Sequence, residues 1–203
     1  MAYWRFGGQA TETGEQPQTQ SAEDVATLPD ESESRPVVDG PGEDGQPETL
    51  AQEQTAPTEE QIFQTLTSAY AALDGYSDRI VDCVDDFNGL YMARSMDDRT
   101  AAKAKADKVK SDLEAAKAEI ESLQIGQASP YATDAANIEE LYDCQIGRIT
   151  SLTDAWAVSV QYDIPSQHQD EILAALAANY EGGNNVYLER YDELYPYAKP
   201  VQK

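Results

Sequence analysis

Residues 58–90 read TEEQIFQTLTSAYAALDGYSDRIVDCVDDFNGL. Thr58 and Gln61 form a capping box, in which each side chain bonds the backbone of the other at the start of a helix. Downstream, apolar side chains recur at alternating steps of four and three residues, the spacing of one buried helix face. The members of this face are Ile62, Leu66, Ala69, Leu73, Tyr76, Ile80, Cys83, Phe87 and Leu90. The stretch therefore predicts one long helix over residues 58–95.

The residues before Thr58 have a different composition. Residues 9–57 contain no Lys, Phe, Tyr or Trp and are rich in Glu, Gln, Pro, Thr, Ser and Gly. Such a segment cannot bury enough apolar surface to offset the entropy lost on ordering it. We therefore expect residues 1–57 to form a disordered acidic tail or stalk, and residues 58–198 to form the folded domain.

The helical spacing of apolar residues continues after the first helix. Asp97 or Asp98 is expected to cap the second helix, and Asn184 or Asn185 the last. A second capping box is expected at residues 166–169. Turns at Gly126–Ser129, Ile164–Pro165 and Gly182–Gly183 separate the segments. The predicted further helices are residues 99–124, 130–162, 166–181 and 185–195.

Signals for β-strands are absent from these segments, because β-branched residues are sparse and no hairpin dipeptide joins two alternating runs. The expected fold is therefore all-α. It is an antiparallel bundle of three long helices with a short C-terminal helical pair packed on it, preceded by the disordered tail. A long coiled-coil hairpin that dimerises is the structural alternative.

The chain is strongly acidic, with 38 acidic and 14 basic side chains and a net charge of −24. Binding to nucleic acid needs clustered Lys and Arg, so nucleic acid is not an expected partner. The lysines of residues 103–110 alternate with acidic residues at helical spacing, which predicts an ion-paired face. No run of about 20 apolar residues is present, so no membrane-spanning segment is predicted.

The first residues suggest nothing decisive about targeting. Met1–Gly8 lacks the apolar core of a signal peptide. The aromatic residues of Tyr3–Phe6 are typical of a chain that leaves a membrane at its interface. One reading is therefore an anchor upstream of Met1, and the other is a start without this role.

The two cysteines, Cys83 and Cys144, are expected at similar heights on two parallel helices. This follows from the predicted helix lengths at 1.5 Å per residue. They are candidates for a disulfide, which requires Cα atoms roughly 4.4 to 6.8 Å apart. A disulfide would indicate an oxidising compartment. The alternative is two free thiols in the core.

Tyrosines recur near the C-terminus. Tyr180, Tyr187, Tyr191 and Tyr195 are separated by seven, four and four positions, which places them on about one side of the last helical pair. One interpretation is an aromatic surface for a peptide, a glycan or a protein. The other is that the rings pack the short helices onto the bundle, with their hydroxyls reaching water.

Groups for catalysis or metal binding are sparse. His168 is the single histidine and falls at the start of a helix, and no Glu-x-x-His motif is present. Zinc coordination and nucleophilic catalysis both need a partner set that one histidine cannot supply. The abundant carboxylates lie beside the apolar faces, as expected for solvated surfaces. We therefore predict no enzyme activity, no cofactor, no metal site and no catalytic residue.

The expected function is a non-enzymatic, extracytoplasmic helical-bundle module of a bacterial cell-envelope or surface protein. The acidic tail would hold it away from the envelope, and a protein or an envelope component would be its partner. The alternative is a cytoplasmic coiled-coil adaptor or oligomeric scaffold that uses the tail for docking. Free thiols and a concentration-dependent homodimer would favour this alternative.

Overall fold

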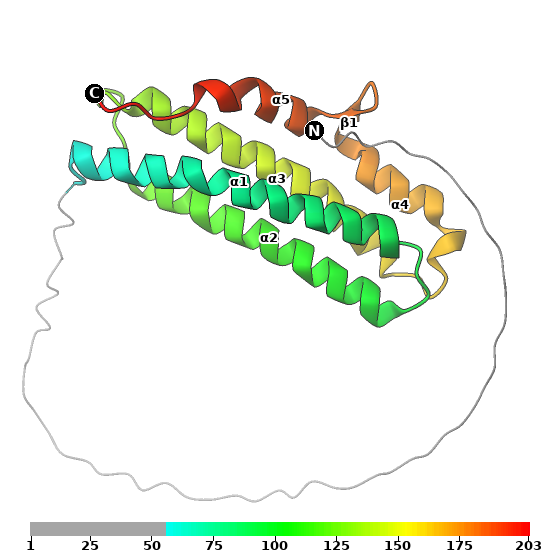
Figure 1. Cartoon of the computed structure of the whole chain (residues 1–203). Coiled ribbons are helices and arrows are strands. Elements are labelled where there is room, and N and C mark those ends of the chain that lie inside the picture. The colour runs from blue at the N-terminus through cyan, green and yellow to red at the C-terminus, as the bar shows by residue number, and fades with distance from the viewer. Residues whose placement is uncertain (1–55) are drawn as a thin grey trace, which may run out of the picture. The chain divides into compact units, whose positions relative to one another are not determined.

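The computed structural model describes residues 56–203, which form a helical bundle (Figure 1). The predicted tail, residues 1–57, lies outside the described residues except for Ala56 and Pro57. Three long helices come first and shorter elements follow, as predicted. The α-helices are α1 (Glu59–Leu90), α2 (Met96–Ser122), α3 (Ala132–Ser159), α4 (Gln169–Leu176) and α5 (Val186–Leu194). Short 3₁₀ turns cover Pro165–Gln167, Ala177–Asn179 and Tyr195–Tyr197.

The start of α1 confirms the predicted capping box. The Gln61 N–H donates to Thr58 Oγ1 at 3.3 Å, and the Thr58 N–H donates to Gln61 Oε1 at 2.8 Å. The helix ends at Leu90 rather than near residue 95, because Ser95 is already the N-cap of α2. The Ser95 hydroxyl accepts the Asp98 N–H at 3.2 Å. The expectation that Asp97 or Asp98 caps α2 was therefore wrong.

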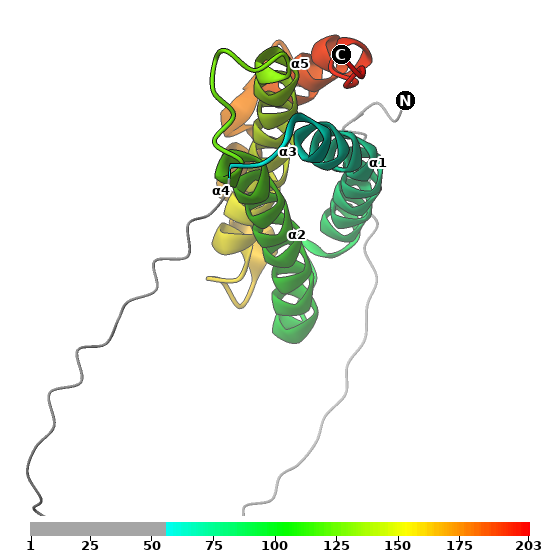
Figure 2. The ribbon, with the colours of Figure 1, turned by 90° about the vertical axis from the view of Figure 1, so that its left-hand side faces the viewer.

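The core of the bundle centres on α3, which contacts each of the other four α-helices. The apolar face of α1 is buried much as its spacing predicts, with half-buried exceptions at Ala69, Tyr76 and Leu90. In α2, buried Ala102 and Ala106 allow close approach of the neighbouring helices. The views in Figures 1 and 2 agree that α5 runs along α3. As a result, α3 is buried on more than one face, whereas α1 and α2 keep an outer face.

One end of the bundle is held by a buried arginine that sequence reasoning missed. Arg99, in the first turn of α2, is 0% exposed. Its guanidinium donates to the carbonyl oxygens of Ser159 and, at 2.8 Å, of Tyr162, at the C-terminal end of α3. A cation is favoured there by the helix dipole. The Ser159 hydroxyl also donates to the Tyr91 carbonyl at 2.8 Å, so the ends of all three long helices are joined.

The connection after α3 differs from the prediction. Pro165 occupies the first position of a 3₁₀ turn, and Ser166 lies within that turn. His168 is therefore the N-cap of α4, and it makes no side-chain capping bond. The second capping box, predicted at residues 166–169, was wrong because the proline turn removes Ser166 from the helix start.

A small hairpin separates α4 from α5, although no strand was predicted. β1 (Tyr180–Glu181) pairs antiparallel with β2 (Asn184–Asn185). Gly182 and Gly183 have φ values of +58° and +93°, and positive φ at both central residues suits a type I′ turn. Asn185 then caps α5, because its Oδ1 accepts the N–H groups of residues 187 and 188 at 3.0 and 3.2 Å. This confirms one of the two predicted caps.

Candidate functional site

The cysteines do not form the predicted disulfide. Cys83 and Cys144 are both buried and both free. The charges that act on Cys83 belong to α1 and α2, with Lys105 foremost, whereas those on Cys144 belong to α3 and α5, with Glu140 and Arg190 foremost. The two thiols therefore lie in different helix interfaces. Burial raises the pKa of both, and that of Cys144 rises to about 11, which makes them poor nucleophiles at neutral pH.

The tyrosines of α5 and of the 3₁₀ turn that follows it face the bundle. Tyr191 is only 6% exposed, and Tyr187 and Tyr195 are half-buried. The Tyr195 ring stacks on Tyr191 with centroids 5.2 Å apart and on Tyr70 of α1 at 4.9 Å. These rings therefore pack α5 onto α1 and α3, which is the structural alternative stated above. Tyr180 lies apart from them, half-buried in β1.

A glycine of α3 makes room for one of these rings. A Cβ atom added at Gly147 would lie 2.5 Å from three atoms of the Tyr187 ring. Carbon atoms in ordinary contact are at least about 3.4 Å apart. Any other residue at position 147 would therefore displace the ring from the α3 backbone.

The interface beneath α5 contains several buried and half-buried polar side chains that hydrogen-bond to one another. Gln145 is fully buried in α3 and donates to Ser77 Oγ of α1 at 2.6 Å. Its Oε1 accepts a bond from Arg148 at 2.7 Å. The Tyr191 hydroxyl belongs to the same region: burial raises its pKa, and the nearby Ser77 and Gln145 side chains offset part of this rise. On the α1 side, the Tyr195 hydroxyl donates to Asp74 Oδ1 at 2.7 Å.

Arg148 is the most distinctive residue of this region. It is half-buried, and its Cζ lies 6.0 Å from the centroid of the Tyr191 ring. Burial lowers its pKa. Among the described residues it forms no salt bridge, although most lysines and arginines of this part of the chain do. Tyr180 and Asp192 are close enough to act on its charge.

The sequence did contain a signal for Arg148. Positions three and four residues away on either side are Cys144, Gln145, Ser151 and Leu152, none of them acidic. A helical arginine normally finds a carboxylate at this spacing in so acidic a chain. The absence of one therefore marks an arginine that is not placed for a local ion pair.

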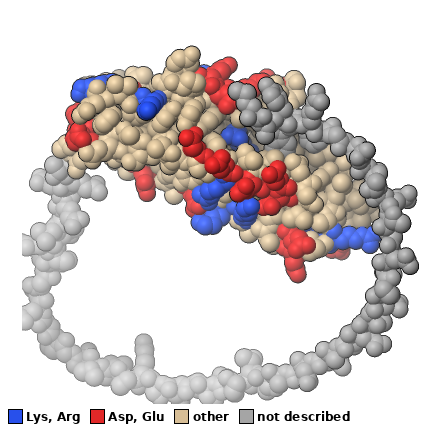
Figure 3. Space-filling model, in the orientation of Figure 1, with Lys and Arg blue, Asp and Glu red and all other residues tan. Residues whose placement is uncertain are grey.

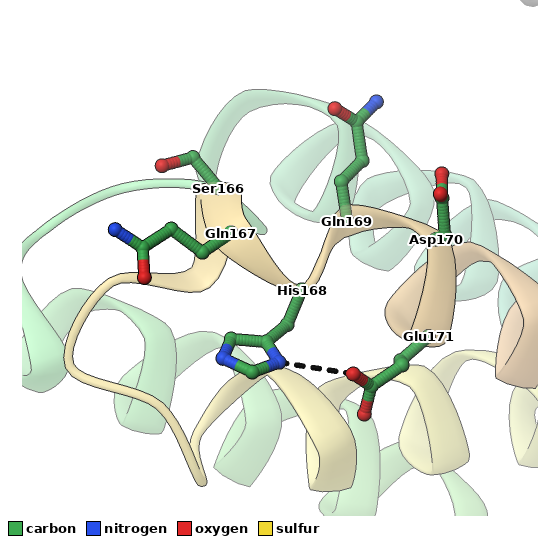
Figure 4. A pocket seen from close by; sticks show the side chains of 6 residues that line it. All are labelled: Ser166, Gln167, His168, Gln169, Asp170 and Glu171. Atoms are coloured by element: carbon green, nitrogen blue, oxygen red, sulfur yellow. Dashed lines mark hydrogen bonds and ion pairs between the residues drawn. The ribbon is translucent and has the colours of Figure 1, made fainter.

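A second feature is a polar hollow at the start of α4, lined by residues 166–171 (Figure 4). His168 Nδ1 lies 3.0 Å from Glu171 Oε1, and the Tyr162 hydroxyl donates to Glu171 Oε2 at 2.8 Å. The His168 ring stacks on Tyr162, with centroids 3.5 Å apart. In Figure 4 the Gln169 and Asp170 side chains point away from the His168–Glu171 pair, and those of Ser166 and Gln167 point toward another side. The arrangement stabilises the start of α4 and does not converge on a ligand position.

The lysine-rich face of α2 is ion-paired, as predicted. On the face shown in Figure 3, basic and acidic side chains gather together over α1 and α2. Lys105 pairs with Asp86 at 2.7 Å, and Arg79 pairs with Asp112 at 2.6 Å. Exposed pairs of this kind contribute little to stability, about 0 to 1 kcal/mol each. This face is therefore a solvated surface and not a basic patch.

Residues 56–203 contain no group of three or more His, Cys, Asp or Glu side chains placed to hold a metal ion. Within the same residues, none of the helices combines the length and the apolar character needed to cross a membrane. No protein-family model, curated protein or solved structure matches the chain. The candidate site is the side of the bundle formed by α3, β1 and α5 around Arg148.

Proposed function

We propose that residues 58–198 form a non-catalytic binding module whose binding face is the side of the bundle formed by α3, β1 and α5. The observation that carries the proposal is Arg148, which forms no salt bridge within residues 56–203 and whose Cζ lies 6.0 Å from the centroid of the Tyr191 ring. Arginine is among the residues that most often dominate binding energy at interfaces. The other cations of the bundle are used in ion pairs, in the Arg99 clamp or on the open surface.

We place this module outside the cytoplasm, in the cell envelope or on the surface of a bacterium. Residues 1–57 would be its acidic stalk, because like charges extend a segment that is poor in core-forming residues. The partner would be a protein or another envelope component.

A specific observation favours a second candidate, a cytoplasmic adaptor or oligomeric scaffold with a docking tail. Both cysteines are free thiols, and free thiols are the usual state in a reducing compartment. Fractionation of the cells that encode the chain separates the two locations. Light scattering over a range of concentrations separates a monomeric module from a scaffold that dimerises.

A matched pair of charge reversals tests the binding face. Asp192→Arg alters the exposed side of α5, and Glu119→Arg alters an exposed position on α2. The immobilised full chain should retain a partner from a membrane or envelope extract, and that partner, once identified and purified, should bind directly. We expect Asp192→Arg to weaken this binding at least about tenfold and Glu119→Arg to leave it unchanged. Equal effects of the two variants would refute the proposed face.

A further inference from the structure

We propose that Arg148 anchors a carboxylate-binding site on the α3–α5 side of the bundle. The inference rests on the proposed binding function and names the chemistry of the group that the module recognises. A guanidinium presents two parallel N–H donors that match the two oxygens of a carboxylate. The ligand would carry this carboxylate on an apolar or aromatic body, because the half-buried Tyr180 lies near Arg148.

The first step is that Arg148 forms no salt bridge within residues 56–203. Arg190 lies in α5, and it pairs with Glu140 at 2.6 Å and with Glu193 at 3.4 Å. Arg99 is satisfied by the carbonyl oxygens at the end of α3. Arg148 has neither solution, although Asp192 is near enough to act on its charge. A partly buried cation without a partner is costly unless another group compensates it.

The second step is that the guanidinium has donors to spare. Its one hydrogen bond to the described residues goes to Gln145 Oε1. Arg148 is half-buried, so the residue keeps contact with solvent. A ligand can therefore approach its side chain without unfolding the bundle.

The third step concerns the neighbours of the arginine. The Tyr191 ring lies 6.0 Å from Arg148 Cζ and holds the guanidinium by a cation–π contact. Gln145 fixes one edge of the guanidinium at 2.7 Å. The arginine is therefore held in place before a ligand arrives, which lowers the entropy lost on binding.

The charge of the chain selects a singly charged ligand. With a net charge of −24, the protein repels anions in proportion to their charge. A carboxylate carries one negative charge, whereas phosphate at neutral pH carries between one and two. We therefore expect carboxylates to bind more tightly than inorganic phosphate.

The test is an NMR titration of the full chain labelled with ¹⁵N-arginine, observed at the side-chain Nε–Hε groups. Sodium benzoate, sodium acetate and sodium phosphate are compared with sodium chloride at equal ionic strength and pH 7. We expect a saturable shift of the Arg148 resonance with benzoate, with a Kd in roughly the millimolar range for one charge-assisted pair. Acetate should bind more weakly and phosphate more weakly still. Arg94, which is exposed and forms no salt bridge among the described residues, is the internal control.

Two variants sharpen the result. Arg148→Lys keeps the positive charge but lacks the two parallel N–H donors of a guanidinium, so benzoate binding should weaken by about tenfold. Arg94→Lys should change nothing. Equal, non-saturating shifts at Arg94 and Arg148 would mean an adventitious ion only and would overturn the proposal. If Arg148→Lys does not fold, the comparison of the two resonances in the unaltered chain still decides.

The two proposals can fail separately. If a partner binds the α5 face while benzoate does not bind and Arg148→Lys leaves partner binding intact, the carboxylate site is refuted and the binding module stands. If benzoate saturates Arg148 while no partner is found in any extract, the carboxylate site stands without the proposed macromolecular partner.

Discussion

The substitution Gly147→Ala tests whether α5 is docked as the structure shows. A Cβ atom at this position would lie 2.5 Å from the Tyr187 ring, so the ring must move by about 1 Å to reach ordinary contact. Gly75→Ala is the matched control, because it adds the same atom inside α1 with nothing within 4 Å. Alanine is favoured over glycine by about 1 kcal/mol in a helix interior.

The magnitudes follow from these two terms. Gly75→Ala should raise the free energy of unfolding by about 1 kcal/mol. At position 147, the same gain is opposed by overpacking of about 1–3 kcal/mol, so the net change should lie between about zero and a loss of 2 kcal/mol. The difference between the two variants isolates the contact with Tyr187, because the helix-propensity terms cancel.

Urea unfolding of the full chain, followed by far-ultraviolet circular dichroism, measures both variants. The slopes should stay equal, so that the midpoints report stability. Adding Tyr187→Ala to Gly147→Ala should remove the clash, and the double-mutant cycle should give a coupling of about 1–3 kcal/mol. If Gly147→Ala is as stabilising as Gly75→Ala, the ring does not lie on the α3 backbone and the packing of α5 described above is refuted.

Three other predictions concern residues outside this contact. Arg99→Met should destabilise the chain by about 3 kcal/mol, because it leaves the carbonyl oxygens at the end of α3 without donors, whereas Arg94→Met on the surface should change the urea midpoint little; equal effects would argue against the clamp. The hydrogen bond from His168, and to a smaller extent the one from Tyr162, lowers the pKa of the Glu171 carboxyl. The contribution of this carboxyl to stability should therefore be fully present above its ordinary pKa of about 4.3, and it should be lost as the pH falls through the lowered pKa. Carbon-13 NMR of that carboxyl should show a depressed midpoint that rises in His168→Ala, and a midpoint that does not move would contradict the contact. Both cysteines should resist iodoacetamide at pH 8 in the folded chain and react after unfolding without reductant, because burial raises their pKa values; a mass lower by two protons would instead show the disulfide.

The long helices could be predicted because their signals are local. The alternation of apolar residues after Ile62 and the capping box at Thr58 both act within a few positions of the chain. Errors arose where two local signals competed. Ser95 and Asp97 are both residues that commonly cap helices, and Ser95 is the N-cap of α2. Pro165 begins a 3₁₀ turn that includes Ser166, so Ser166 does not cap α4.

The candidate site was harder to predict because it depends on contacts between distant segments. The spacing of the tyrosines places them on one face of α5 but cannot say whether that face turns toward the bundle or toward solvent. Gly147 reads as a weak helix residue until the ring of Tyr187 is placed over it. The clamp of Arg99 joins residues about 60 positions apart in sequence, as its bond to Ser159 shows. Periodicity carries no information on such pairs.

The most direct test of the account is a crystal structure of the chain grown with benzoate. We expect α5 in place on α3, with the Tyr187 ring over Gly147 and the benzoate carboxylate within hydrogen-bond distance of the Arg148 guanidinium. A structure in which Arg148 instead pairs with Asp192 or another carboxylate of the chain, with no benzoate beside it, would contradict the account.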